Sequence, residues 1–96
     1  MEFSLDLTIK VNQLLDDLKL SDQDKLDKVD SALAKLAANP RHPSLNSHPY
    51  ETFKGPNDEP IWESYVENNT PSAWRLWWYY GPDRGVITVV EIGPHP

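Results

Sequence analysis

The sequence contains no cysteine, and this absence excludes two kinds of protein at once. A chain of 96 residues without thiols can build neither a disulfide framework nor a thiolate metal site. The three histidines, His42, His48 and His95, are scattered, so a structural zinc site would require folding to bring them together. We therefore expect no metal site, and the absence of cysteine fits a reducing compartment.

An excess of basic residues is also lacking. The chain carries 9 Lys and Arg against 15 Asp and Glu, which gives a formal net charge of −6. Residues 1–38 hold five basic and eight acidic side chains, and residues 39–96 hold four and seven. Because neutralising phosphates requires clustered Lys and Arg, we expect no global nucleic-acid surface and no direct DNA binding. A local cationic spot remains around Arg41, His42, His48 and Lys54.

Long hydrophobic runs and familiar catalytic motifs are missing as well. The N-terminal residues lack the basic region and continuous apolar run of a signal peptide, and no run approaches the ~20 residues of a membrane span. We therefore expect a cytoplasmic protein with no membrane partner. The sequence has no GxGxxG, Walker A loop, HExxH or GxSxG, so we also expect no cofactor.

The chain is instead rich in aromatic and β-branched residues over residues 73–93. Two apolar runs, 73–80 and 86–92, flank the segment Gly81-Pro82-Asp83-Arg84-Gly85. Aromatic and β-branched side chains suit a pleated, half-buried surface, and Gly and Pro suit a tight turn. This pattern predicts a β-hairpin.

The first 38 residues show two different periods. Residues 2–7 alternate between polar and apolar side chains, which predicts a strand. Residues 9–19 and 22–38 have the apolar spacing of helices, with Thr8 and Ser21 as expected N-caps. One longer helix beginning at residue 4 is the alternative. A link of two or three residues between the helices favours an antiparallel pair.

The middle of the chain is less regular. Residues 39–60 contain five prolines, so they form either a functional loop or a stiff connector. Within this stretch, residues 50–54 could form a short edge strand. After it, the pattern of residues 61–67 predicts a further strand. The order β-α-α-β-β-β indicates a single α+β domain over residues 1–96. It would pack an antiparallel helical hairpin on a small twisted, mainly antiparallel sheet.

Arg75 stands out because it interrupts an aromatic strand. Alternation places Arg75, Trp77 and Tyr79 on one face of the sheet, opposite the side chains that would form the core. If helices cover only one face, this set becomes a partly open platform that carries a guanidinium. Such a platform could bind RNA by stacking and phosphate contact, or an amphipathic protein segment. The alternative is structural: Arg75 stacks on Trp and pairs with Glu63.

Two acidic residues are also candidates. The period of two places Glu63 and Glu67 on one face of their strand. The plainer interpretation is that both are unpaired surface carboxylates. Nothing in their spacing indicates a glycosidase pair.

Several stretches together resemble the RelE/ParE superfamily of bacterial toxins from type II toxin–antitoxin pairs, in particular its RelE-like branch. The resemblance spans nearly the whole chain and includes NPRHPSLNSHPY after the second helix, WESYVEN, AWRLWWYY and the closing ITVVEIGPHP. It implies a RelE-like fold and a cognate antitoxin as partner. The gyrase-inhibiting branch lacks the His-bearing end and fits less well.

The RNA-cleaving branch implies an endoribonuclease that needs no metal and acts on mRNA at the ribosome. In this chemistry the ribose 2′-hydroxyl attacks the adjacent phosphorus. By resemblance, the catalytic residues would be Arg75 on the phosphate, His95 as acid or base, and His48 and Glu63. The RNA-binding residues would be Arg41, His42, Lys54 and Tyr79.

Two features depart from the family pattern. RNA-cleaving members are usually strongly basic, whereas this chain is acidic. Members also commonly carry a catalytic Tyr or Phe after the C-terminal His, a place where this sequence has only Pro96, so Tyr79 or Tyr80 would have to substitute. A catalytically inactive RelE-fold module that binds a protein partner is therefore the second hypothesis.

Overall fold

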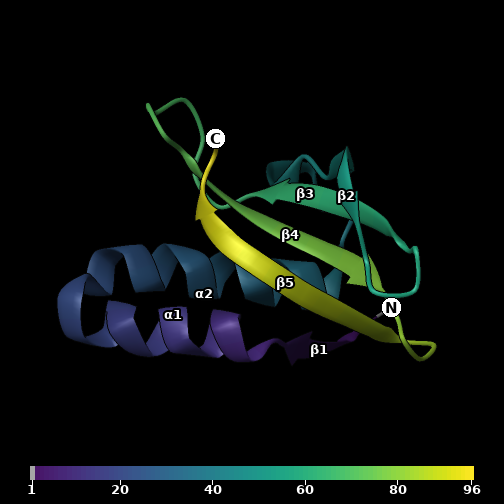
Figure 1. The fold of residues 1–96 in the computed structure, drawn as a ribbon. Coiled ribbons are helices and arrows are strands. Elements are labelled where there is room, and N and C mark those ends of the chain that lie inside the picture. Colours follow the sequence, from purple (N-terminus) through teal and green to yellow (C-terminus); the bar gives the residue numbers. More distant parts are fainter. Residues whose placement is uncertain (1) are drawn as a thin grey trace.

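The computed structural model describes residues 2–96 and shows two helices packed on one face of a five-stranded sheet (Figure 1). Strand β1 (Ser4–Leu7) is followed by helix α1 (Ile9–Ser21), helix α2 (Gln23–Ala38) and the short 3-10 helix η1 (Pro43–Leu45). The remaining strands are β2 (His48–Lys54), β3 (Pro60–Tyr65), β4 (Trp74–Tyr80) and β5 (Val86–Pro94). The predicted α+β architecture is confirmed.

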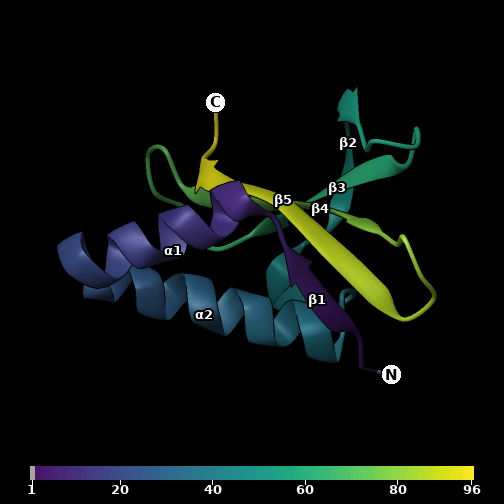
Figure 2. The ribbon, with the colours of Figure 1, turned by 60° about the horizontal axis from the view of Figure 1, so that its bottom comes forward.

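The sheet has the order β1-β5-β4-β3-β2. Strand β1 runs parallel to β5, and the other neighbouring pairs are antiparallel. Figure 2 shows both helices on one side of the sheet, with the β2 end curving away from them. The hairpin β4–β5 therefore lies in the middle of the sheet, with a bulge between Trp77 and Trp78.

The main core fills the space between the helices and the sheet. Apolar side chains of α1 and α2 meet Leu76, Trp78, Ile87 and Val89 of the central strands, all of which are buried. The indole of Trp78 donates a hydrogen bond to Ser64 Oγ at 2.8 Å, so the buried Trp keeps a polar partner. No helix in residues 2–96 is long and apolar enough to cross a membrane.

The N-terminal elements follow the predicted change of period. The alternative of one helix from residue 4 is wrong, because residues 4–7 form β1 and the Thr8 side chain caps α1 by accepting from Val11 N. The expected cap at Ser21 is also wrong. Ser21 ends α1, and Asp22 is both the C-cap of α1 and the N-cap of α2. The helices are thus joined by a single residue.

Two strand boundaries differ from the prediction. Strand β2 begins at His48, two residues earlier than expected, and it pairs with β3 through His48 and Glu63. Strand β3 ends at Tyr65, because Glu67 turns toward α2 and meets Lys25. The prediction that Glu63 and Glu67 share a face is therefore wrong.

Candidate functional site

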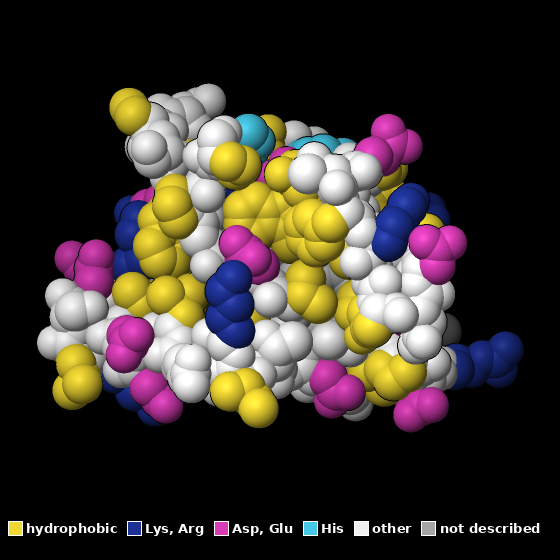
Figure 3. Space-filling model, viewed as in Figure 1, with side chains coloured by type: hydrophobic (Ala, Val, Ile, Leu, Met, Phe, Trp, Pro, Cys, Tyr) yellow, Lys and Arg dark blue, Asp and Glu magenta, His cyan; other side chains and the backbone are white. Residues whose placement is uncertain are grey.

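The outer face, the side of the sheet away from the helices, carries a second small hydrophobic cluster. Ile61, Trp77 and Tyr79 are buried there, with Tyr50 and Val90 packed against them. Trp77 and Tyr79 are only 4% and 6% exposed, so the expected open stacking platform is wrong at these two rings. Figure 3 shows hydrophobic side chains gathered over the middle of the sheet and histidines near its upper edge.

Beside this cluster lies a buried carboxylate that contacts two histidines. Glu63 is 2% exposed, which contradicts the interpretation as a surface side chain. Its Oε1 lies 2.7 Å from His48 Nε2, and its Oε2 lies 3.7 Å from His95 Nε2. Strands β2 and β3 and the residue that follows β5 bring these three side chains together. We call them the His48–Glu63–His95 cluster.

The His48 ring shows what this cluster can do. Its Nδ1 lies 2.7 Å from the carbonyl oxygen of Asn46, and its Nε2 lies 2.7 Å from Glu63. A carbonyl oxygen only accepts, so Nδ1 carries a proton. The contact at Nε2 then needs a second proton, held either by the ring or by the carboxyl. A histidine hydrogen-bonded to a carboxylate is an arrangement that general acid–base chemistry can use.

Arg75 lies on the same face, one diagonal step from Glu63. The register pairs Arg75 with Tyr65, and Glu63 with Trp77. The guanidinium lies over the Tyr65 ring at 3.7 Å, and Nη1 donates to the carbonyl oxygens of Glu67 and Trp74 at 2.6 and 3.1 Å. The expected structural alternative, stacking on Trp and pairing with Glu63, is wrong. Within residues 2–96 no carboxylate forms an ion pair with Arg75, so its charge is not neutralised by an acidic side chain there.

Glu67 fixes the segment that holds Arg75. Its carboxylate accepts from Lys25 Nζ at 2.8 Å, from Lys28 Nζ at 3.2 Å and from Trp74 N at 3.1 Å. These bonds, the one from Lys25 foremost, hold the pKa of Glu67 below its usual value of 4.5, although partial burial opposes them. The sequence does not indicate this role, because Lys25 and Lys28 have the spacing of an ordinary solvated helix face.

Comparison with known proteins decides the fold. No family model matches the sequence, and neither does any curated protein. Among solved structures, the "YoeB/ParE toxin from Agrobacterium tumefaciens" superposes with a TM-score of 0.71 at 13% identity, covering 98% of this chain and 100% of that one. The RelE of an archaeal RelE–RelB complex from Pyrococcus horikoshii gives 0.69 at 13% identity over 98% and 96%. The chain has the RelE/ParE toxin fold.

This fold spans the whole described chain. A YoeB dimer from Staphylococcus aureus superposes with a TM-score of 0.64 at 10% identity and covers 100% of both chains. Identities this low carry the fold alone, so the activity must be argued from the side chains. In the RelE-like fold of this chain, His48, Glu63, Arg75 and His95 share the outer face.

The remaining expected residues lie elsewhere on the RelE-like fold. Arg41 and His42 line a cavity with Trp62, on the helix side of the sheet. Lys54 ends β2, which His48 begins, and the register of β2 against β3 shifts between Tyr50 and Lys54. Tyr79 is buried in the outer cluster and offers no free ring face. The structure therefore places Arg41 and His42 on the side of the sheet away from the expected catalytic residues, whereas Tyr79 shares their face but is buried.

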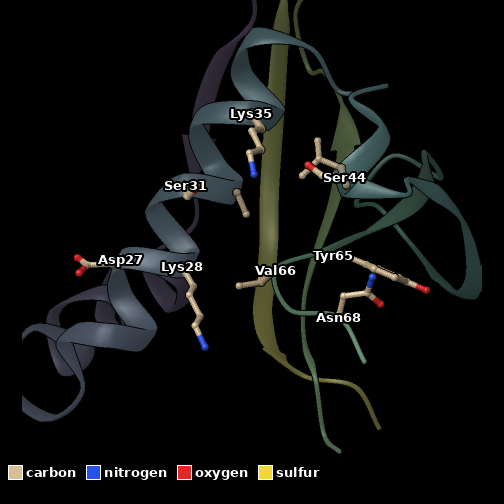
Figure 4. Close-up of a pocket in the computed structure, with 10 residues that line it drawn as sticks. Asp27, Lys28, Ser31, Lys35, Ser44, Tyr65, Val66 and Asn68 are labelled. Carbon is tan, nitrogen blue, oxygen red and sulfur yellow. The ribbon is translucent and has the colours of Figure 1, made fainter. Parts of the chain in front are cut away.

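A groove of mixed lining includes Tyr65, the residue on which Arg75 stacks. It has a volume of about 470 Å³ and lies between α2 and the end of β3. Figure 4 shows Lys28 and Lys35 extending from α2, with Tyr65 and Ser44 across the gap and Asp27 pointing away. Tyr65 therefore contacts both this groove and the guanidinium of Arg75.

The acidic and imidazole groups do not assemble into a metal site. In the part of the chain that the structure describes, no group of three or more His, Asp or Glu side chains is placed to hold a metal ion. The His48–Glu63–His95 cluster instead lies beside the guanidinium of Arg75, on the same face of the sheet.

Proposed function

We propose that this protein is a RelE-like toxin that cleaves mRNA and is held inactive by a cognate antitoxin. One observation carries the proposal: a hydrogen-bonded histidine–carboxylate pair lies on the same face as Arg75, which has no acidic partner within residues 2–96. The archaeal structural neighbour was solved as a RelE–RelB complex, which supports an antitoxin partner here. The setting would be the cytoplasm, on the translating ribosome.

The proposed reaction needs a base, a cation and an acid. The deprotonated His48–Glu63 pair takes the proton of the ribose 2′-hydroxyl, and the 2′-oxygen forms a bond to the adjacent phosphorus. Arg75 stabilises the charge on the phosphorane. The bond from phosphorus to the 5′-oxygen then breaks, and protonated His95, which is 47% exposed, supplies the proton to that oxygen. The products carry a 2′,3′-cyclic phosphate and a 5′-hydroxyl.

Arg75→Ala tests this proposal. When the wild-type chain is induced in a bacterial host, we expect growth arrest and mRNA cut on ribosomes, mapped by sequencing the new 5′ ends. Removing the guanidinium should lower cleavage by about 100-fold or more, because it withdraws the charge that stabilises the transition state. Arg84→Ala is the matched control, since Arg84 is an exposed arginine in the β4–β5 turn.

The outcomes separate two functions. Full cleavage by a folded Arg75→Ala protein would contradict the proposed role of Arg75. No arrest and no cleavage by the wild type, with or without ribosomes, would leave the second candidate, an inactive RelE-fold module that binds a protein partner. The net charge of −6 favours that candidate, because RNA must approach an acidic surface.

A further inference from the structure

An aromatic wall lies on the helix side of the sheet, opposite the His48–Glu63–His95 cluster. Trp62 and Trp78 are cross-strand partners whose rings stack 6.0 Å apart at 18°. Tyr80 meets both rings edge-on, at 6.3 Å from Trp62 and 5.0 Å from Trp78. Trp78 is fully buried and fixes the arrangement, whereas Tyr80 is 42% exposed and Trp62 is half-buried. The wall thus presents ring surface to a cavity of about 430 Å³.

The opposite wall of this cavity is cationic and polar. It is formed by the loop before β2, which contributes Arg41, His42 and Ser47. His42 Nδ1 accepts the backbone N–H of Ser44 at 3.1 Å, so the neutral ring carries its proton on Nε2 and keeps a donor. Arg41 forms no ion pair within residues 2–96. Although the chain is acidic, no Asp or Glu lines the cavity.

The loop is held in place before any ligand binds. Ser47 Oγ donates to the carbonyl oxygen of Pro40 at 2.7 Å, and Asn39 Oδ1 accepts the N–H of Arg41 at 3.0 Å. Pro40 is buried, and Pro43 begins η1. A preformed wall of this kind lowers the entropy that binding would otherwise cost.

We propose that this cavity binds a nucleotide, with the base against Trp62 and Tyr80 and the phosphate at Arg41 and His42. Its volume lies within the ~300–1,000 Å³ usual for ligand pockets. Aromatic rings bind any base through its π-face, and an arginine beside an imidazole donor recognises phosphate. A purely apolar ligand would leave the charge of Arg41 without a partner in the cavity. The inference goes beyond the proposed nuclease, because the cavity lies on the other side of the sheet.

The test is a titration of the full chain with AMP. Binding is monitored by the NMR chemical shifts of the backbone amides and the tryptophan indoles. We expect the shifts to centre on the loop that holds Arg41 and His42 and on the Trp62 indole. Arg41→Ala should weaken AMP binding about tenfold, the effect of one charge-assisted contact. Arg84→Ala, which changes an exposed arginine that does not line the cavity, should bind AMP like the wild type.

Two fragments test the two halves of the site. Adenosine has the base without the phosphate, and ribose 5-phosphate has the phosphate without the base. Each fragment should bind at least about tenfold more weakly than AMP. A 2′-O-methyl oligonucleotide, which lacks the nucleophilic hydroxyl, then distinguishes the sources: tighter binding than AMP indicates a nucleotide within RNA, and weaker binding indicates free nucleotide.

Several results would overturn the inference. These are the absence of shifts at millimolar AMP, shifts centred on Glu63 and His95, adenosine or ribose 5-phosphate binding as well as AMP, and unchanged affinity in Arg41→Ala. Because the readout is binding, loss of RNA cleavage in Arg75→Ala has no bearing on it. The proposed nuclease and this cavity can therefore fail separately.

Discussion

Glu67 joins three parts of the molecule through one side chain and one carbonyl group. Its carboxylate, 11% exposed, meets Lys25 and Lys28 of α2. The same carboxylate accepts the N–H of Trp74, and the carbonyl oxygen of Glu67 accepts from Arg75. The residue thereby connects the helix layer to the strand that carries the proposed phosphate-binding arginine.

Glu67→Gln should destabilise the fold by about 2 kcal/mol, because hydrogen bonds to a charged group at a mostly buried position are among the stronger ones. Urea unfolding measures the change. Glu91→Gln is the matched control: its ion pair with Lys10 has side chains 47% and 71% exposed. That substitution should change stability by less than about 0.5 kcal/mol. Equal losses in the two variants would contradict the role of Glu67.

The same carboxylate predicts a pH dependence. Because the pKa of Glu67 is held below 4.5, its stabilisation is fully present above that pH and is lost as the pH falls through the lowered pKa. The stability difference between wild type and Glu67→Gln should therefore be constant near neutrality and shrink on acidification. A difference that persists unchanged into strong acid would show that the charge of Glu67 is not its source.

One residue, Asp22, caps both helices at the junction of α1 and α2. Asp22 N–H donates to Leu18 O at 2.8 Å and closes α1, and Asp22 Oδ1 accepts from Lys25 N at 3.0 Å and opens α2. Asp22→Ala should cost about 1 kcal/mol in thermal or urea unfolding, since it removes the N-cap acceptor. Asp30→Ala, at an exposed position within α2, should fall within about 0.5 kcal/mol of wild type. A larger loss in Asp30→Ala would overturn this account.

Elements set by local pattern were predictable from the sequence. The helices over 9–21 and 23–38 follow apolar spacing, and the β4–β5 hairpin follows from two apolar runs around Gly and Pro. The parallel pairing of β1 with β5 was not predictable, because it joins segments about 80 residues apart through backbone bonds that leave no pattern. The early start of β2 is similar: it depends on pairing with β3.

The candidate site was also predictable only in part. Alternation correctly placed Arg75, Trp77 and Tyr79 together, but it could not show that Tyr50 and Val90 would bury the two rings. The sequence marked His48, Glu63 and His95 only through a family resemblance. Their contacts arise from tertiary structure, as does the separation of Arg41 and His42 onto the other side of the sheet.

At the scale of the whole molecule, an acidic chain would offer RNA few places to bind. The net charge is −6, and one arginine lies at each proposed site, Arg75 on the outer face and Arg41 at the aromatic cavity. Neither forms an ion pair within residues 2–96. Strong electrostatic attraction over a broad surface is therefore not expected. Binding should depend on a small number of well-placed phosphate contacts.

This argument predicts a shallow salt dependence for RNA binding. Each neutralised phosphate of a single strand contributes a slope of about −0.7 in log K against log salt concentration, so two contacts give about −1.4. Fluorescence anisotropy with a 2′-O-methyl RNA, which cannot be cleaved, measures the slope across a salt series. Arg75→Ala and Arg41→Ala should each make it shallower by about 0.7, and Arg84→Ala should leave it unchanged. A wild-type slope near −4 would require a broad basic surface, which is incompatible with the even spread of acidic residues along this chain.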